Sequence, residues 1–359
     1  MPSWNDLGTA VSTLRELDVT AIREESERPL AIACLGPRPL FNRVYALLRG
    51  HGTARYGPAG RDPLAHQPLA AGEPDDDLRR SDLVLVLMDG REPVSPAGAE
   101  ALADLGRLAL PTVLAICGVA SPGAMGQPRP EFAHAKIVVL PDLESPEARA
   151  SLAAALLDRL PSELHLAAAR ALPGLREVYA GELVGSVSFT NATYAFASAV
   201  PAQIPILAVP FAAADIIVLT KNQALMVYRL ALANGAPPEF QARIAEVAPV
   251  VGGAFVWRQL ARTLVGLVPF WGIAPKVAVA YSGTYVTGVA ALRWFADGEL
   301  LSRERLRQLA DETMKVGRER AKEIVAAARE RGGQARFRLP WRRKGSAELD
   351  PGATPDPRA

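Results

Sequence analysis

The sequence predicts two structural parts, a doubly wound parallel α/β sheet followed by an all-α, partly hydrophobic helical domain. Between residues 28 and 160, short and continuous apolar runs alternate with helical patterns. Such runs are typical of strands that are buried on both faces of a parallel sheet. From residue 161 onward, long apolar segments replace this alternation. The chain has 359 residues, 49% of them hydrophobic, which is enough for two folded units.

The elements of the first part can be predicted one after another. Residues 1–27 place apolar positions among charges, which indicates a partly amphipathic helix that ends near Arg28 and Pro29. The later patterns then predict, in order, a strand over 29–35, a helix over 40–50, a strand over 82–89, a helix from 97, strands over 112–118 and 136–141, and a helix over 145–160. Residues 50–80, rich in Gly, Pro and Asp, are predicted to be a loop.

Charge and cysteine content exclude some classes of protein. A formal net charge of +2 is too small for a globally basic nucleic-acid-binding protein. Cys34 and Cys117 both lie in apolar runs, so we expect reduced thiols packed in the core, on strands that could be neighbours, and no disulfide framework. The first residues lack the pattern of a signal peptide, so any membrane contact is expected from the cytoplasmic side.

The stretch after the first predicted strand lies where many α/β proteins bind a nucleotide. A phosphate-binding loop reads G-x-x-x-x-G-K-[ST], with glycines for close approach, a lysine for the phosphates and a hydroxyl for magnesium. Alignment on Gly36 places Phe41 at the second glycine, Asn42 at the lysine and Arg43 at the hydroxyl. Two prolines in the same stretch also lack backbone N–H donors. The sequence therefore predicts a degenerate phosphate loop that binds no cofactor, although Arg43 could still attract a phosphate.

In the order of these elements, and in VYALLRG after the loop, residues 28–160 resemble the translation-factor-like small GTPase domain. The resemblance implies Asn-Lys-x-Asp after the strand that begins at Thr112, but residues 117–120 read Cys-Gly-Val-Ala. It also implies an Asp-x-x-Gly motif before residue 82, which HQPLAAGEP does not supply, and an aspartate at the end of the second strand, where Asp89 stands. The resemblance thus implies a P-loop-GTPase-like fold without the motifs for GTP hydrolysis.

The second part contains two long apolar regions. Residues 161–194 are predicted to form helices joined at Pro173 and Gly174. The apolar span within residues 199–235 is almost long enough to cross a bilayer, which takes about 20 residues, but the prolines and Asp215 argue against a simple crossing. Residues 247–292 are interrupted by basic side chains and contain many glycines that would let helices approach closely. Both a membrane-associated helical hairpin domain and a fully soluble bundle are compatible with this pattern.

Residues 161–300 also resemble a known family. The segments 215–235, 252–288 and 291–299 are similar to the YcjF-like domain of unknown function, family number 697, which often follows a GTPase domain in bacteria. Its members are generally described as membrane or membrane-associated proteins without an established activity. The resemblance therefore implies an architecture and a location, and leaves the reaction open.

A series of polar residues interrupts the first apolar region and permits two interpretations. Its members are Asp215, Thr220, Gln223, Tyr228 and Arg229. In the first interpretation Thr220 is the N-cap of a helix and the others form hydrogen bonds between helices. In the second, Asp215, Gln223 and Arg229 line a site for a ligand or partner. The histidines are scattered and predict no metal site.

The chain ends in a charged and then a basic segment. Residues 301–332 are predicted to form an exposed helix that packs on the bundle or on a partner through a narrow apolar stripe, composed of Leu306, Leu309, Met314, Val316, Ile324 and Val325. Residues 333–359 are predicted to be basic and then disordered. Their basic and aromatic side chains suit an anionic bilayer surface or a solubilising tail, and nucleic acid is not expected; they are Arg336, Arg338, Trp341, Arg342, Arg343 and Lys344.

Together these patterns favour a non-catalytic pseudo-GTPase-type scaffold or regulator at the cytoplasmic face of the membrane. Its expected partners are membrane lipid and an unidentified protein, and we expect no catalytic residue, metal, cofactor or nucleotide. One alternative is a nucleotide-responsive GTPase-like switch with an atypical binding mode. The other is a wholly soluble interaction protein in the cytoplasm.

Overall fold

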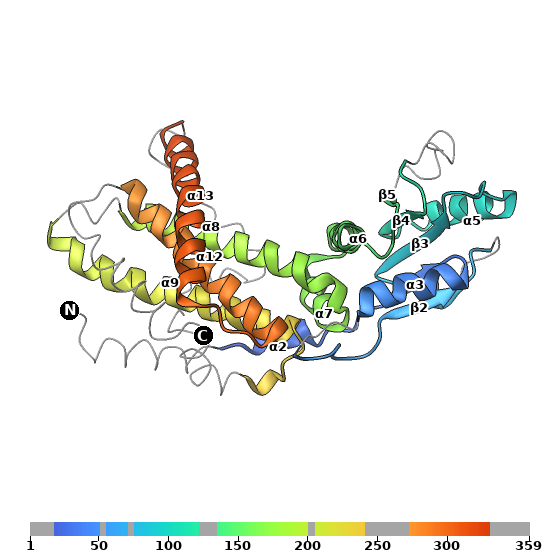
Figure 1. Ribbon diagram of the computed structural model, residues 1–359, viewed down its shortest axis with the longest axis horizontal. Coiled ribbons are helices and arrows are strands. Elements are labelled where there is room, and N and C mark those ends of the chain that lie inside the picture. Colours follow the sequence, from blue (N-terminus) through green and yellow to red (C-terminus); the bar gives the residue numbers. More distant parts are fainter. Residues whose placement is uncertain are drawn as a thin grey trace, which may run out of the picture.

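The computed structural model is elongated, with a parallel sheet at one end and a group of long helices at the other (Figure 1). It describes residues 18–50, 55–70, 75–121, 135–199, 205–240 and 273–330.

The sheet has five strands, all parallel, in the order β2-β1-β3-β4-β5. They are β1 (Ile32–Leu35), β2 (Leu64–Gln67), β3 (Leu83–Asp89), β4 (Thr112–Cys117) and β5 (Ala135–Leu140). The prediction of a parallel α/β sheet is therefore confirmed. In the sheet, β2 lies on one side of β1 and β3 lies on the other. The direction in which successive strands are added therefore reverses between β1 and β3.

The prediction of a loop over residues 50–80 is wrong. This stretch contains β2 at the edge of the sheet and the short helix α4 (Asp76–Arg79). None of the four residues of β2 is fully buried, so the strand carries no apolar run by which the sequence could reveal it. Its backbone nevertheless pairs with β1 in register, from Ile32 beside Leu64 to Leu35 beside Gln67.

Helices cover both faces of the sheet. Alternate residues of β3 point to opposite faces, so Leu85 packs in the core with α3 (Arg38–Arg49) and α6 (Pro146–Arg159), whereas Val86 packs with α5 (Pro96–Arg107). Both α5 and α6 begin at a serine N-cap, because the Ser95 and Ser145 hydroxyls each accept a backbone N–H at 3.0 Å. These helices lie where the sequence predicts them.

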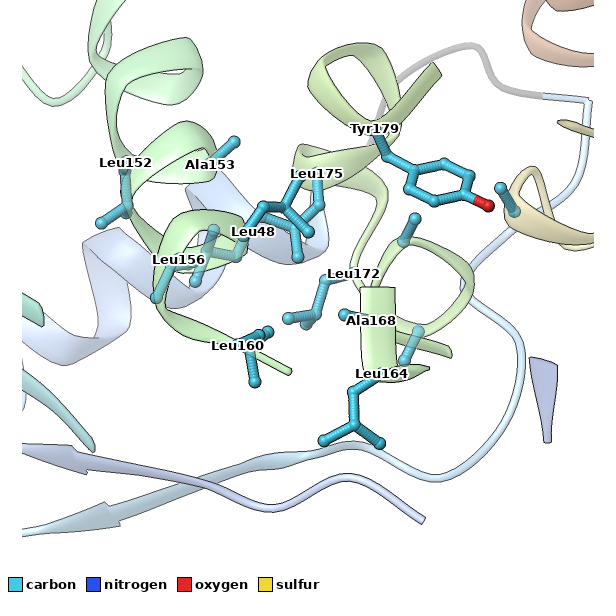
Figure 2. Packing of buried hydrophobic residues seen from close by; sticks show 14 of the residues in the cluster. Leu48, Leu152, Ala153, Leu156, Leu160, Leu164, Ala168, Leu172, Leu175 and Tyr179 are labelled. Carbon is cyan, nitrogen blue, oxygen red and sulfur yellow. The ribbon is translucent and has the colours of Figure 1, made fainter. Parts of the chain in front are cut away.

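The core on the α3 and α6 side continues into the second part of the chain. The connecting elements are η3 (Ser162–Leu164), α7 (His165–Ala171) and η4 (Pro173–Leu175), and they lead into α8 (Arg176–Ala199). Figure 2 shows Leu48 of α3 and Leu156 of α6 close to Leu172 and Leu175. A Cβ at Gly174 would lie 2.8 Å from the carbonyl oxygen of Leu47, so η4 is seated directly on the end of α3. The sheet and the helices therefore share one hydrophobic core.

Three long helices form the centre of the second part: α8, α9 (Pro205–Ala233) and α12 (Ile273–Asp297). Asn191 of α8 contacts both Asn222 of α9 and Thr284 of α12, and Val184 of α8 packs on Gly288 of α12. Ala195 of α8 also clusters with Leu219 of α9, so α8 is antiparallel to both other helices. Among the helices of the described residues, none is both long and apolar enough to cross a lipid bilayer.

Two smaller elements accompany the bundle. The helix α2 (Thr20–Ser26) confirms the end of the predicted N-terminal helix, whose residues 1–17 lie outside the described residues. The short η6 (Pro238–Phe240) follows the end of α9.

The predicted charged helix is present as α13 (Arg303–Glu330) and packs on α12, which confirms the interpretation that it covers its own bundle. Leu306 and Ile324 are buried in this contact, as predicted. Val316 is 47% exposed, so its place in the predicted stripe is wrong. Successive steps of three and four residues from Leu306 stay on its face of the helix, and they bring Thr313 and Gly317 to the contact instead.

Gly317 lets α13 approach α12 closely, since a Cβ there would lie 2.7 Å from the Ala278 carbonyl oxygen. We expect Gly317→Ala to lower the free energy of unfolding by about 1–3 kcal/mol, because the helices must move apart. The matched control is Gly181→Ala on α8, where no atom lies within 4 Å and alanine should be neutral or stabilise by up to about 1 kcal/mol. Urea unfolding followed by circular dichroism measures both changes, and equal effects would contradict the close crossing.

Candidate functional site

The connection between β1 and α3, where the degenerate phosphate loop is predicted, consists of Gly36 and Pro37 alone. The Gly36 N–H donates to the Gln67 carbonyl oxygen (3.1 Å), and the Gly36 carbonyl accepts from His66 Nε2 (2.9 Å). Both polar backbone groups of Gly36 are thus bonded to β2. A loop that cradles phosphate presents unpaired backbone N–H groups to the ligand, and this connection has none at Gly36 or Pro37.

Gly36 has a positive φ of 142° and lies against β3. A Cβ at this position would collide with the Leu87 carbonyl oxygen and would lie 3.1 Å from the Leu87 side chain. In a phosphate loop, a glycine lets the backbone approach the ligand closely. Here Gly36 instead lets the end of β1 approach β3.

The next residues of the predicted degenerate loop pack in the core or face solvent. Phe41 is 7% exposed, and its ring centroid lies 4.8 Å from that of His66 and 5.6 Å from that of Tyr45. Asn42 and Arg43 are exposed, and the Arg43 guanidinium lies 3.7 Å from the Glu144 carboxylate. Phe41 therefore fills the position at which the second glycine of a phosphate loop would leave room for the phosphate.

The ends of β3 and β4, where the GTPase resemblance places further motifs, are joined by hydrogen bonds. Asp89 Oδ1 accepts from the Arg91 N–H at 3.0 Å, and the Gly90 N–H donates to the Cys117 carbonyl at 2.9 Å. Arg91 Nε donates to the Gly118 carbonyl at 3.2 Å. The residues at the predicted base-reading position thus form a turn that packs on the end of β3.

The two cysteines are free and buried, as expected, but they are not neighbours. Cys34 lies on β1 and Cys117 on β4, and β3 separates these strands. Burial raises the pKa of each thiol to about 12, so neither forms a reactive thiolate at neutral pH. Elsewhere in the described part of the chain, no three His, Cys, Asp or Glu side chains gather as metal ligands.

A pair of buried arginines, which we call the arginine clamp, joins the sheet to the helices. Arg170 Nη1 donates to the carbonyls of Leu232 and Ala236 at the end of α9, at 2.9 and 2.8 Å. Arg176 Nη1 and Nη2 donate to the carbonyls of Tyr56 and Gly57, at 2.9 and 2.8 Å. Arg176 Nε also donates to a carbonyl of α7 at 3.3 Å.

Both arginine side chains of the clamp are charged and buried. Burial, followed by repulsion from Arg170, lowers the pKa of Arg176 to about 10, so its guanidinium remains protonated at neutral pH. Burial also lowers the pKa of Arg170. Because a buried cation must be compensated, the carbonyl oxygens around each guanidinium are essential acceptors.

The clamp holds one segment in particular, residues 55–59 between α3 and β2. The Ala59 N–H donates to the Arg170 carbonyl at 3.1 Å, and the Arg55 N–H donates to the Ala296 carbonyl at 3.0 Å. The Arg55 guanidinium also lies 4.5 Å from the centre of the Trp294 ring. This segment of the α/β part is thereby fixed to α7, α8 and α12.

The predicted polar series divides among separate partners. Tyr228 Oη donates to the Pro238 carbonyl at 3.0 Å, and Arg229 pairs with Glu25 of α2 at 2.7 Å. Gln223 instead faces Thr284 of α12. The structure therefore does not unite Gln223 and Arg229 in one site.

The remaining two members of the series lie within α9. Thr220 is buried inside this helix, so its prediction as an N-cap is wrong, because the helix already begins at Pro205. Asp215 also belongs to α9, and its side chain is outside the described part of the chain.

Gln223 belongs to a buried polar layer between the long helices, composed of Asn191, Asn222, Gln223 and Thr284. This layer supports the interpretation that the polar residues form hydrogen bonds between helices.

The predicted basic and aromatic cluster, Arg336, Arg338, Trp341, Arg342, Arg343 and Lys344, lies outside the described residues. Comparisons of the chain with protein-family models, curated proteins and solved structures found no match.

Proposed function

We propose that this protein is a non-catalytic scaffold or regulator, in which a degenerate GTPase-like α/β part is joined to a YcjF-like helical part at the cytoplasmic face of the membrane. The observation that carries the proposal is the direct connection from β1 to α3 through Gly36 and Pro37. A triphosphate requires a loop with free N–H donors and a metal ligand at this place.

Several positions that would act on a nucleotide have other partners. The polar groups of Gly36 bond to β2, and Phe41 packs beside His66 in the core. The turn at Gly118 bonds to Arg91. Since phosphoryl transfer depends mainly on positioning and charge stabilisation, the loss of these groups argues against GTP hydrolysis.

A scaffold needs parts that keep a fixed relation to each other, and two features support this role. The hydrophobic core runs from the sheet into α7 and α8 without a break. The arginine clamp adds hydrogen bonds between the α3–β2 connection and the helices. In this proposal the sheet stabilises and orients the helical part, which contacts the membrane and a protein partner.

The membrane contact is proposed from the sequence. The YcjF-like resemblance, the apolar regions 199–235 and 247–292, and the basic cluster within residues 336–344 all favour it. A basic residue near an anionic bilayer contributes about 1 kcal/mol of attraction, which salt weakens.

Vesicle flotation tests this location. We expect the full chain to float with vesicles of phosphatidylcholine and phosphatidylglycerol, and less with phosphatidylcholine alone. Replacing Arg342, Arg343 and Lys344 by glutamine should reduce the difference, whereas Lys315, Arg318 and Lys322 on α13 replaced by glutamine serve as the control with equal charge loss. Recovery of the full chain only in the vesicle-free fraction would instead favour a wholly soluble interaction protein.

Restoration of the local loop residues is expected to give no enzyme. The triple variant Phe41→Gly, Asn42→Lys and Arg43→Ser should show no GTP turnover with magnesium, because the connection stays short and the other motifs remain absent. The loss of the buried Phe41 ring should also lower the free energy of unfolding by about 3–5 kcal/mol. The control, Asn42→Lys with Arg43→Ser, keeps Phe41 and should retain stability. Phosphate release above background by either variant would contradict the proposal.

A further inference from the structure

The polar layer between α8, α9 and α12 has a nearly complete set of hydrogen bonds. Asn222 Nδ2 donates to Asn191 Oδ1 at 2.7 Å, and Asn191 Nδ2 donates to Thr284 Oγ1 at 2.8 Å. Gln223 Nε2 donates to the same Thr284 oxygen at 3.1 Å. The side chains of Asn191, Gln223 and Thr284 are almost completely shielded from solvent.

The Thr284 hydroxyl fixes the orientation of the Gln223 amide. Its single proton goes to the Ala280 carbonyl at 2.8 Å, so its oxygen can only accept from the two amides. Gln223 must therefore turn its Nε2 towards Thr284, and its Oε1 points elsewhere. A flipped amide would place two acceptors against each other.

Among the buried side-chain atoms of the described residues that have no hydrogen-bond partner are Gln223 Oε1 and Ser188 Oγ. Ser188 lies three residues before Asn191, on the same face of α8. Because α8 and α9 are antiparallel and Asn191 meets Asn222, Ser188 and Gln223 differ in height along the bundle by only about 3 Å at 1.5 Å per residue. Both are almost completely buried, with Ser188 at 0% and Gln223 at 2% exposure.

We propose that the polar layer binds one ordered water molecule, which donates a hydrogen bond to Gln223 Oε1 and accepts one from the Ser188 hydroxyl. A buried acceptor without a donor is costly, and buried waters in proteins typically bond two to four such groups. The ligand is neutral because the layer consists of amides and hydroxyls, without a carboxylate to balance a cation. The occupied site completes the hydrogen bonding that fixes the relative positions of the three helices.

A high-resolution crystal structure of the unmodified full chain tests the site directly. We expect a density peak at hydrogen-bond distance, about 2.7–3.2 Å, from both Gln223 Oε1 and Ser188 Oγ. The proposal is overturned if that space is empty, if a protein donor occupies it, or if the peak has the short distances of a bound cation.

A double-mutant cycle tests the same bridge in solution. Ser188→Ala and Gln223→Met should each reduce the folding equilibrium constant, and the second change should cost at least about twofold less once the first is present. Ser186→Ala is the matched control, because this serine is exposed on the same helix and its effect should multiply with that of Gln223→Met. Purely multiplicative effects at Ser188 would contradict a shared water. If a variant does not fold, the crystal structure of the unmodified chain decides.

Discussion

Replacement of Arg176 by methionine is expected to lower the free energy of unfolding by about 3 kcal/mol, one of the largest single-residue effects in this protein. Methionine keeps much of the apolar stem but leaves the carbonyls of Tyr56 and Gly57 without their donors. Hydrogen bonds from a charged group contribute about 1.5–3 kcal/mol each, and the removal of the costly buried charge offsets part of that loss.

Urea unfolding of the full chain measures this effect against a matched arginine. Arg293→Met removes a guanidinium that is 61% exposed and pairs with Asp297 one turn away, so we expect a change within about 0.5 kcal/mol. Arg176→Lys should lie closer to methionine than to the natural residue, because an ammonium cannot match the fork of the guanidinium. An Arg176→Met variant as stable as Arg293→Met would show that the clamp does not hold the two parts together.

Gly36→Ala is the second substitution for which a large effect is expected, a loss of about 3 kcal/mol or more in the free energy of unfolding. Its added methyl group would collide with the Leu87 carbonyl oxygen, and the residue would also retain an unfavourable positive φ. Backbone atoms of a central strand cannot move aside without breaking the sheet.

Gly60→Ala separates these two causes. Gly60 also has a positive φ, of 92°, but no atom lies within 4 Å of its Cβ position. We expect about 1–2 kcal/mol from the backbone conformation alone. Thermal unfolding of both variants gives the comparison, and similar melting temperatures would mean that β3 is not in close contact with Gly36.

The sequence predicted the elements whose apolar pattern is local. The predicted strands over 29–35, 82–89 and 112–118 each contain an apolar run that suits a buried strand, and the serine caps of α5 and α6 lie where helices begin. β2 could not be found in this way, because an edge strand with half-exposed residues is held by backbone pairing with β1.

The contacts between segments that are far apart along the chain could not be predicted from the sequence either. Arg170 and Arg176 read as ordinary charged residues in a helical stretch, and their carbonyl acceptors lie far away along the chain. Gln223 stands out in the sequence as a polar residue within an apolar region, but its partner Thr284 lies on another helix. By contrast, the mismatch between residues 36–43 and the pattern G-x-x-x-x-G-K-[ST] depends on these residues alone, so it could be read directly from the sequence.

The most direct test of the central claim is a calorimetric titration of the full chain with GTP, GDP and ATP, each with and without magnesium. The Gly36–Pro37 connection and the buried Phe41 predict no saturable heat at any accessible nucleotide concentration. Binding with a micromolar dissociation constant, strengthened by magnesium, would contradict this account and favour a nucleotide-responsive switch.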